Sequence, residues 1–131
     1  MANLLGTTLN GPLHEKTASA TCTSGPPTVA VDISTANLFE VDLQPAGAAI
    51  TVFTITGVKS GYVNSFVLKI TNGTSLGNPL SFNWASLTAF KWPGGTGPVL
   101  TYRDDAIDIL SFTTYDNGTT WYGQQAGADF Q

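Results

Sequence analysis

Between residues 108 and 123 the chain reads DILSFTTYDNGTTWYG, and this stretch decides the class of fold. A run rich in β-branched and aromatic residues reaches Tyr115, and a similar run resumes at Thr119. Between them, Asn117-Gly118 supplies the positive φ angles that a tight hairpin turn requires. The tryptophans of the chain lie in its last third, from about residue 90, or just before it. We therefore expect a β-hairpin here, in the best-buried part of the fold.

Upstream, short segments alternate apolar and polar residues, which is the pattern of half-buried strands. We expect such strands over residues 29–34, 39–44, 66–71 and 80–85. Residues 50–56 are apolar on both faces, so we expect them to form a central strand. Turn residues separate these segments, and no helical periodicity is visible. The sequence predicts an all-β fold, an antiparallel β-sandwich or jelly-roll-like domain.

The first 28 residues differ from the rest in composition. Thr, Ser, Gly, Pro and Ala dominate them, and residues 22–28 read CTSGPPT, a stiff and non-helical stretch. We predict an extended N-terminal arm over residues 1–28 and a β-sandwich domain over residues 29–131. The arm is either a disordered tail or a segment that becomes ordered along a neighbouring subunit. Its candidate interaction residues are Leu4, Leu5, Leu9 and Leu13. We expect deletion of residues 1–27 to leave the domain folded.

The chain is poor in charge, with 11% charged residues and a net charge of −4. Soluble domains usually carry about 25% charged residues, so this surface consists largely of Ser, Thr, Asn, Gly and backbone. Such a surface suits burial against copies of the chain or a larger partner, although a neutral β-domain covered in Thr and Asn would share it. The few basic residues are scattered, which argues against nucleic acid or an anionic membrane as a partner.

Cysteine and histidine are too scarce for a disulfide or a zinc site. Cys22 is the only cysteine and His14 the only histidine, whereas zinc needs several such ligands in register. The N-terminus lacks the basic start and apolar core of a secretory signal. No apolar run approaches the ~20 residues that span a bilayer. We therefore expect synthesis in a reducing cytosol.

Asp104, Asp105 and Asp108 form one cluster of carboxylates. Their spacing could ligate calcium, but the Gly and the distal Glu of an EF-hand loop are missing. Paired carboxylates also suggest glycoside hydrolysis, although so few acids offer little cleft. Neither a Gly-x-Ser-x-Gly elbow nor a phosphate-binding glycine loop is present. A solvated loop explains the cluster more simply, so we predict no catalytic residue, no metal and no cofactor.

Four aromatic residues are candidate interaction residues: Trp92, Tyr115, Trp121 and Tyr122. Aromatic rings stack on the apolar faces of sugars, so they could line a carbohydrate-binding face. Large aromatics also dominate protein cores and subunit contacts, which explains them more simply. The Trp121→Ala variant separates the two, because loss of stability indicates core and loss of glycan binding alone indicates a sugar face.

Two stretches together resemble a small β-module of tailed-bacteriophage virion proteins, cyanobacterial phages among them. They are FKWPGGTGPVLT at residues 90–101 and the hairpin stretch at residues 108–123. In that module a strand with a Lys-Trp-Pro signature precedes a Gly-rich loop, a strand and an aromatic hairpin. Residues 31–34 and 39–43 resemble its opening strands, so the resemblance covers about residues 29–130. Asn117 stands where the module would have Gly, and Gln124-Gln125 where it would have an apolar residue.

The resemblance implies a non-enzymatic virion component, a homotrimer made in the host cytoplasm and placed on the particle surface. Such modules occur in tail-fibre-like proteins and in short stand-alone virion proteins. One placement is a capsid decoration (cement) protein whose N-terminal arm reaches over the major capsid protein and neighbouring copies. The other is a tail-fibre or receptor-binding appendage that recognises a host glycan. The short length and the arm favour decoration, because a fibre usually needs repeats or a coiled coil. A small glycan hydrolase is a third, weaker alternative.

Overall fold

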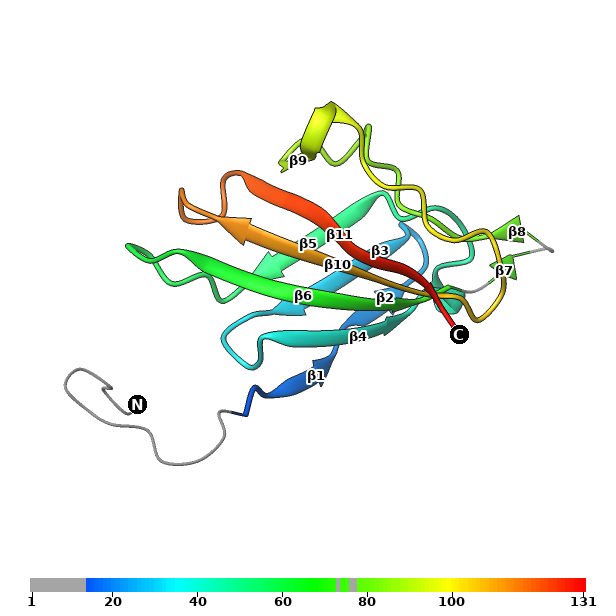
Figure 1. Cartoon of the computed structure of the whole chain (residues 1–131), viewed down its shortest axis with the longest axis horizontal. Coiled ribbons are helices and arrows are strands. Elements are labelled where there is room, and N and C mark those ends of the chain that lie inside the picture. The colour runs from blue at the N-terminus through cyan, green and yellow to red at the C-terminus, as the bar shows by residue number, and fades with distance from the viewer. Residues whose placement is uncertain (1–13, 73, 76–77) are drawn as a thin grey trace.

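The computed structural model describes residues 14–72, 74–75 and 78–131. The fold is all-β and β-sandwich-like, which confirms the predicted fold class. In Figure 1 the strands of a large sheet lie in front of those of a small one. The large sheet has the order β1 (Thr17–Ser19), β4 (Leu38–Asp42), β6 (Asn64–Thr71), β10 (Ile107–Thr114), β11 (Trp121–Phe130) and β9 (Phe90–Lys91). The small sheet has the order β2 (Thr21–Thr23), β3 (Thr28–Asp32) and β5 (Val52–Thr56).

Four short elements complete the described chain. Strands β7 (Thr74–Ser75) and β8 (Asn78–Pro79) pair as a small antiparallel hairpin. The 3-10 turns η1 (Gln44–Ala46) and η2 (Pro93–Gly95) follow β4 and β9. Within the described ranges, no helical segment has the length and apolar character needed to cross a bilayer.

Several strand pairs are parallel, whereas we expected antiparallel pairing. They are β1–β4, β4–β6, β3–β5 and β9–β11. The turn after β3 explains part of this difference. Asp32 accepts hydrogen bonds from the backbone N and hydroxyl of Ser34, and Thr35 N donates to the Asp32 carbonyl. This compact turn carries the chain from the small sheet to the large one, so β3 and β4 do not form a hairpin.

The core lies between the two sheets and is rich in aromatic rings. Along β10 every second residue is buried, and Phe112 is fully enclosed. The ring centroid of Phe53, from the small sheet, lies 5.0 Å from that of Phe90 and 5.6 Å from that of Phe112. Trp121 packs edge-on against Phe66, with centroids 5.4 Å apart. Most of these rings belong to the last third of the chain or to β6, which pairs with it.

Two of the expected strands are wrong in position or kind. The segment predicted to be a central strand forms β5, which lies at the edge of the small sheet. Its alternate residues are exposed, and Val52 is a surface residue although it is apolar. Residues 80–85 form no named strand, although Leu80 and Phe82 are buried. The side-chain oxygen of Asn72 accepts the Leu80 N–H at 3.0 Å, and Phe82 makes only an isolated bridge to Ile50.

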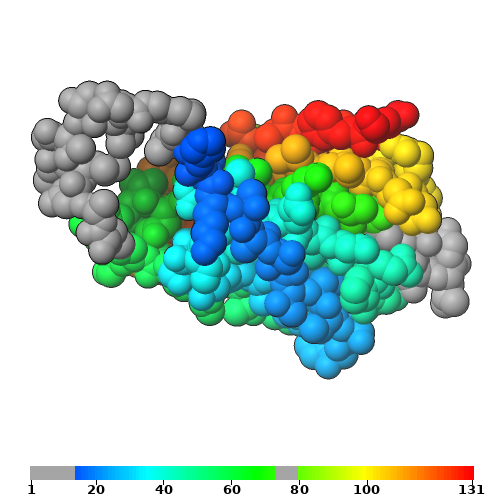
Figure 2. Space-filling model, turned by 90° about the horizontal axis from the view of Figure 1, so that it is seen from below, coloured from blue at the N-terminus to red at the C-terminus, as the bar shows by residue number. Residues whose placement is uncertain are grey.

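The described part of the predicted arm belongs to both sheets. Its β1 pairs with β4 at the edge of the large sheet, and its β2 pairs with β3 in the small sheet. Figure 2 shows this N-terminal segment, in blue, running over the surface from one sheet towards the other. Half-buried Ala18, Ala20 and Cys22 pack against the core. The predicted interaction residues Leu4, Leu5, Leu9 and Leu13 lie outside the described residues.

Candidate functional site: an aromatic hollow on the last hairpin

The turn of the last hairpin is held by its own side chains, which confirms the predicted β10–β11 hairpin. Asn117 and Gly118 adopt φ angles of 60° and 87°. The carboxylate of Asp116 accepts the Thr120 N–H at 2.8 Å and the Thr114 hydroxyl at 3.0 Å. The Thr120 N–H, by hydrogen bonding, lowers the pKa of Asp116 below its ordinary value. This network fixes where the strands start and end, and so where their outer side chains point.

Two tyrosines at this end of the hairpin expose their rings. Tyr115 follows β10 and is 69% exposed, and Tyr122 on β11 is 53% exposed. Their ring centroids lie 6.0 Å apart, and the ring planes meet at 62°. Thr113 of β10 stands opposite Tyr122 in the strand register. The two rings therefore form a corner on the outer face of the large sheet.

Trp92 also borders the hollow, but its indole packs on the core side of β11, over Gly123 and edge-on against Phe112. A Cβ atom at position 123 would lie 2.6 Å from the indole ring of Trp92. Trp92 packs edge-on against Trp84, with centroids 4.6 Å apart. The two indoles differ in hydrogen bonding: Trp84 Nε1 donates to the Pro98 carbonyl at 2.9 Å, whereas the buried Trp92 Nε1 has no partner among the described residues.

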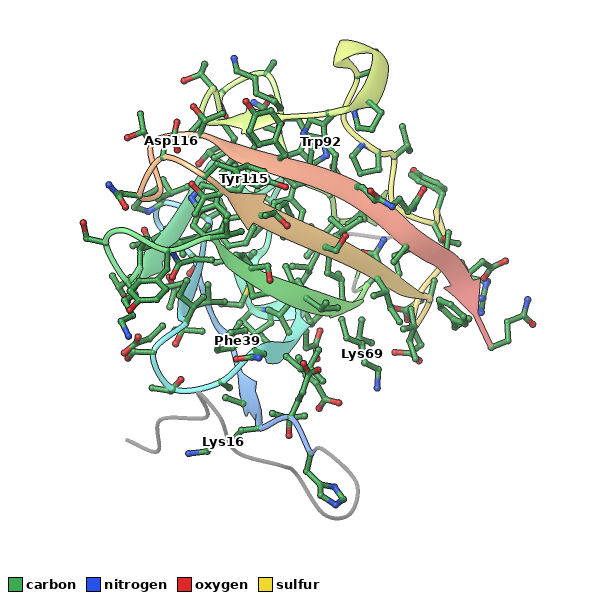
Figure 3. The ribbon with its side chains drawn as sticks, turned by 60° about the vertical axis from the view of Figure 1, so that its left-hand side comes forward. Lys16, Phe39, Lys69, Trp92, Tyr115 and Asp116 are labelled. Atoms are coloured by element: carbon green, nitrogen blue, oxygen red, sulfur yellow. The ribbon has the colours of Figure 1, made fainter. Side chains whose placement is uncertain are left out.

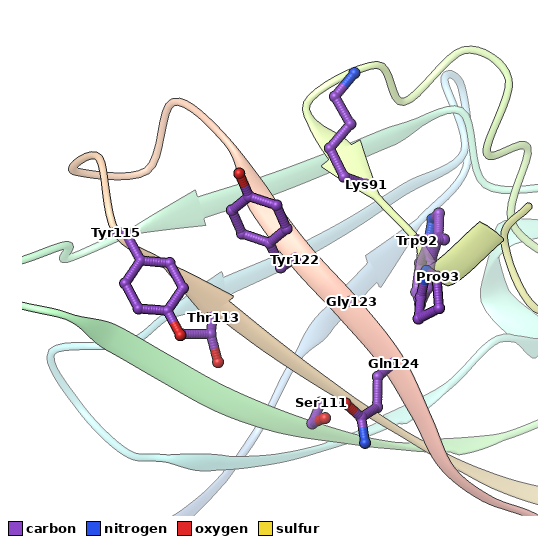
Figure 4. Close-up of a pocket in the computed structure, with 9 residues that line it drawn as sticks. All are labelled: Lys91, Trp92, Pro93, Ser111, Thr113, Tyr115, Tyr122, Gly123 and Gln124. Carbon is purple, nitrogen blue, oxygen red and sulfur yellow. The ribbon is translucent and has the colours of Figure 1, made fainter. Parts of the chain in front are cut away.

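These side chains surround a hollow of about 390 Å³, which we call the tyrosine hollow (Figure 4). Its aromatic and ring-bearing walls are Trp92, Pro93, Tyr115 and Tyr122. Polar side chains and one glycine line it between them, namely Ser111, Thr113, Gly123 and Gln124. Lys91 is the only charged residue among those that line the hollow.

The structure brings three of the predicted interaction residues together, Trp92, Tyr115 and Tyr122. Trp121 is not with them, because it is 3% exposed and faces the core on the opposite side of β11 from Tyr122. Sequence analysis missed Lys91 and the polar residues that line the hollow. The alternation of Ser111 and Thr113 with buried Leu110 and Phe112 could have placed those two on the outer face.

The three aspartates do not form a site. Asp108 is buried and accepts hydrogen bonds from Thr101 N at 2.6 Å, the Thr101 hydroxyl at 2.7 Å and Asp129 N at 2.8 Å. Asp104 and Asp105 are exposed in the loop before β10. Among the described residues no group of three or more His, Cys, Asp or Glu residues could hold a metal ion. Burial raises the pKa of the half-buried Cys22 thiol, which makes it a weak nucleophile.

Comparison with known proteins adds no assignment. No protein-family model, no curated protein and no solved structure matches the chain.

Proposed function

We propose that this chain is a non-enzymatic structural protein of a tailed-bacteriophage virion, and that it decorates the capsid as a homotrimeric cement protein. In this role the β-sandwich domain stands on the shell, while the N-terminal arm contacts the major capsid protein and neighbouring copies. The resemblance of residues 29–130 to the phage β-module supports the proposal. So does the low charge of the chain, because a surface of this kind is suited to burial against other subunits.

The observation that carries the proposal is how the arm enters the fold. Its strand β1 lies at the edge of the large sheet, where its partner in the described chain is β4 alone. Thr17, Ala18 and Ser19 carry no charge, and edge strands that face no partner are usually protected by charge or by a covering segment. An uncharged edge strand at the base of the arm can be extended by the backbone of another subunit.

The test is the number of copies per particle. Quantitative mass spectrometry of purified virions should find hundreds of copies, measured against the major capsid protein. A few to a few dozen copies would contradict the decoration role and favour a tail position. Complete absence from purified particles would overturn the virion proposal itself.

The tyrosine hollow favours a second candidate, a tail-fibre or receptor-binding appendage that recognises a host surface glycan. Tyr115 and Tyr122 are exposed and adjacent, as expected of rings that stack on sugars. In this role the partners are other tail proteins and the host glycan. The same copy-number measurement separates the two candidates, because tail appendages are present in far fewer copies than shell proteins.

A further inference from the structure

The aromatic corner of the tyrosine hollow has the shape of a sugar-ring site. Tyr115 and Tyr122 meet at 62°, so one ring can lie under a flat ligand while the other borders its edge. A sugar ring has one face of C–H groups and a rim of hydroxyls, which matches an aromatic face with polar groups around it. The hollow, at about 390 Å³, falls in the range of about 300–1,000 Å³ usual for small-molecule sites.

The polar side chains of the hollow have hydrogen-bonding capacity to spare. Ser111, Thr113 and Gln124 lie on the outer face of β10 and β11. In residues 14–72, 74–75 and 78–131, none of the described hydrogen bonds uses these three side chains. Two hydroxyls and one amide together offer both donors and acceptors, as the hydroxyls of a sugar require. These groups add specificity to the apolar contact with the rings.

The charge of the hollow points to an acidic ligand. Lys91 takes part in neither of the ion pairs of the described chain, which join Lys69 to Glu40 and Arg103 to Asp129. Figure 3 shows that Lys16 and Lys69 lie well away from Tyr115 and Trp92. The carboxylate beside the hollow belongs to Asp116, whose Oδ1 is held by the hairpin turn. Lys91 is therefore the cation that an anionic group in the hollow would meet.

We propose that the tyrosine hollow binds one ring of an acidic saccharide, such as a uronic acid. The C–H face of the sugar stacks on Tyr122, which lies between Tyr115 and Lys91 in Figure 4. The sugar carboxylate faces Lys91. The side chains of Ser111, Thr113 and Gln124 form hydrogen bonds with the sugar hydroxyls. The site suits either a shell protein or a tail appendage. It is measured on the purified chain, so its failure leaves the virion proposal standing.

The test compares acidic and neutral oligosaccharides of equal length. An oligogalacturonate and an oligomannuronate are titrated against the purified full chain, with galacto- and manno-oligosaccharides as neutral counterparts. Amide shifts in NMR spectra identify the residues that respond. We expect the acidic sugars to bind, with shifts gathered around Lys91, Tyr122 and Gln124. Added salt should weaken this binding, because a contact between exposed charges is screened.

Variants separate stacking from charge. Tyr122→Ala should weaken binding of the acidic sugar about tenfold, because it removes the stacking face, while Tyr122→Phe should retain most of it. Lys91→Ala should weaken binding of the acidic sugar up to about fivefold and leave the neutral sugars unaffected. The matched control is Tyr102→Ala, an exposed tyrosine beyond the opposite end of β10, which should bind as the parent does.

Three results would overturn the proposal. They are no binding of either acidic sugar, equal binding of acidic and neutral sugars, or the same loss of affinity in Tyr102→Ala as in Tyr122→Ala. Near-UV circular dichroism of each variant checks that the fold is intact. Because Tyr122 is exposed on the outer face, its truncation leaves the core unchanged.

Discussion

At the scale of single residues, two neighbouring tryptophans have opposite hydrogen-bonding status. Trp84 Nε1 donates to the Pro98 carbonyl, whereas Trp92 Nε1 is buried without a partner among the described residues. Replacing either by phenylalanine removes a similar amount of aromatic surface, but only Trp84→Phe also breaks a hydrogen bond. We expect Trp84→Phe to lower the free energy of unfolding by about 1 kcal/mol more than Trp92→Phe. Urea denaturation of both variants measures the difference. Equal losses would contradict this account.

Trp121 and Tyr122 are adjacent in sequence but lie on opposite faces of β11. Trp121 is buried against Phe66, and Tyr122 is exposed beside Tyr115. Trp121→Ala should therefore destabilise the fold by about 3–5 kcal/mol through the cavity it leaves. Tyr122→Ala should cost about 0.5 kcal/mol or less as a surface change. Thermal and urea unfolding of the two variants test this contrast. A small loss of stability in Trp121→Ala would contradict the burial of Trp121 in the core.

The carboxylate of Asp116 makes the hairpin turn sensitive to acid. The Thr120 N–H holds the pKa of Asp116 below its ordinary value of 3.8. A lowered pKa means that the folded chain favours the ionised form, so the turn is supported above pH 3.8 and loses that support as the pH falls through the folded pKa. An NMR titration of the Thr120 amide should show a midpoint below 3.8 that disappears in Asp116→Asn. A midpoint above that value would contradict the hydrogen-bond assignment.

At the scale of elements, buried Asp108 joins three parts of the structure. Its carboxylate lies at the start of β10 and accepts hydrogen bonds from Thr101 in the preceding loop and from Asp129 near the end of β11. Asp108→Ala should cost about 2–3 kcal/mol, because it leaves three partly buried donors without their carboxylate acceptor. The exposed Asp104 is the control, and Asp104→Ala should change stability by about 0.5 kcal/mol or less. Chemical denaturation compares the two, and similar small losses would show that the Asp108 bonds contribute little.

The last hairpin could be predicted because its signals are local. Asn117-Gly118 requires positive φ, and the β-branched and aromatic runs on either side form strands by their own preferences. The edge position of β5 and the missing strand at residues 80–85 could not be predicted in the same way. Alternation shows which side chains are buried but not which backbone groups find a partner. Here the side chain of Asn72 takes the Leu80 N–H that a strand partner would have used.

The tyrosine hollow was predictable only in part, for a related reason. Trp92, Tyr115 and Tyr122 stand out because aromatic side chains are conspicuous in a sequence. Lys91 and Gln124 become neighbours only through the pairing of β9 with β11, a parallel contact between segments about thirty residues apart. The hydrophobic periodicity of a sequence does not predict which distant strands pair.

At the scale of the whole molecule, the described part of the predicted arm supplies strands to both sheets. Deleting residues 1–13 removes none of the described strands, so it should cost less stability than a deletion that reaches residue 27. Deleting residues 1–27 also removes β1 and β2, an edge strand of each sheet, together with the contacts of Ala18, Ala20 and Cys22 to the core. The longer deletion should therefore lower the melting temperature. Thermal unfolding of both truncated chains tests this, and equal melting temperatures would show that β1 and β2 add no stability.

The alternation of the chain between the two sheets also governs how the protein folds during synthesis. The small sheet has all its strands once residue 56 is made, but β6 receives its partner β10 only when residues 107–114 emerge. Until then the edge of β6 that pairs with β10 has no partner. Folding must therefore wait for the last third of the chain, and contacts so distant in sequence are slow to form. A protease-resistant domain should therefore appear only after residues 107–114 have been made.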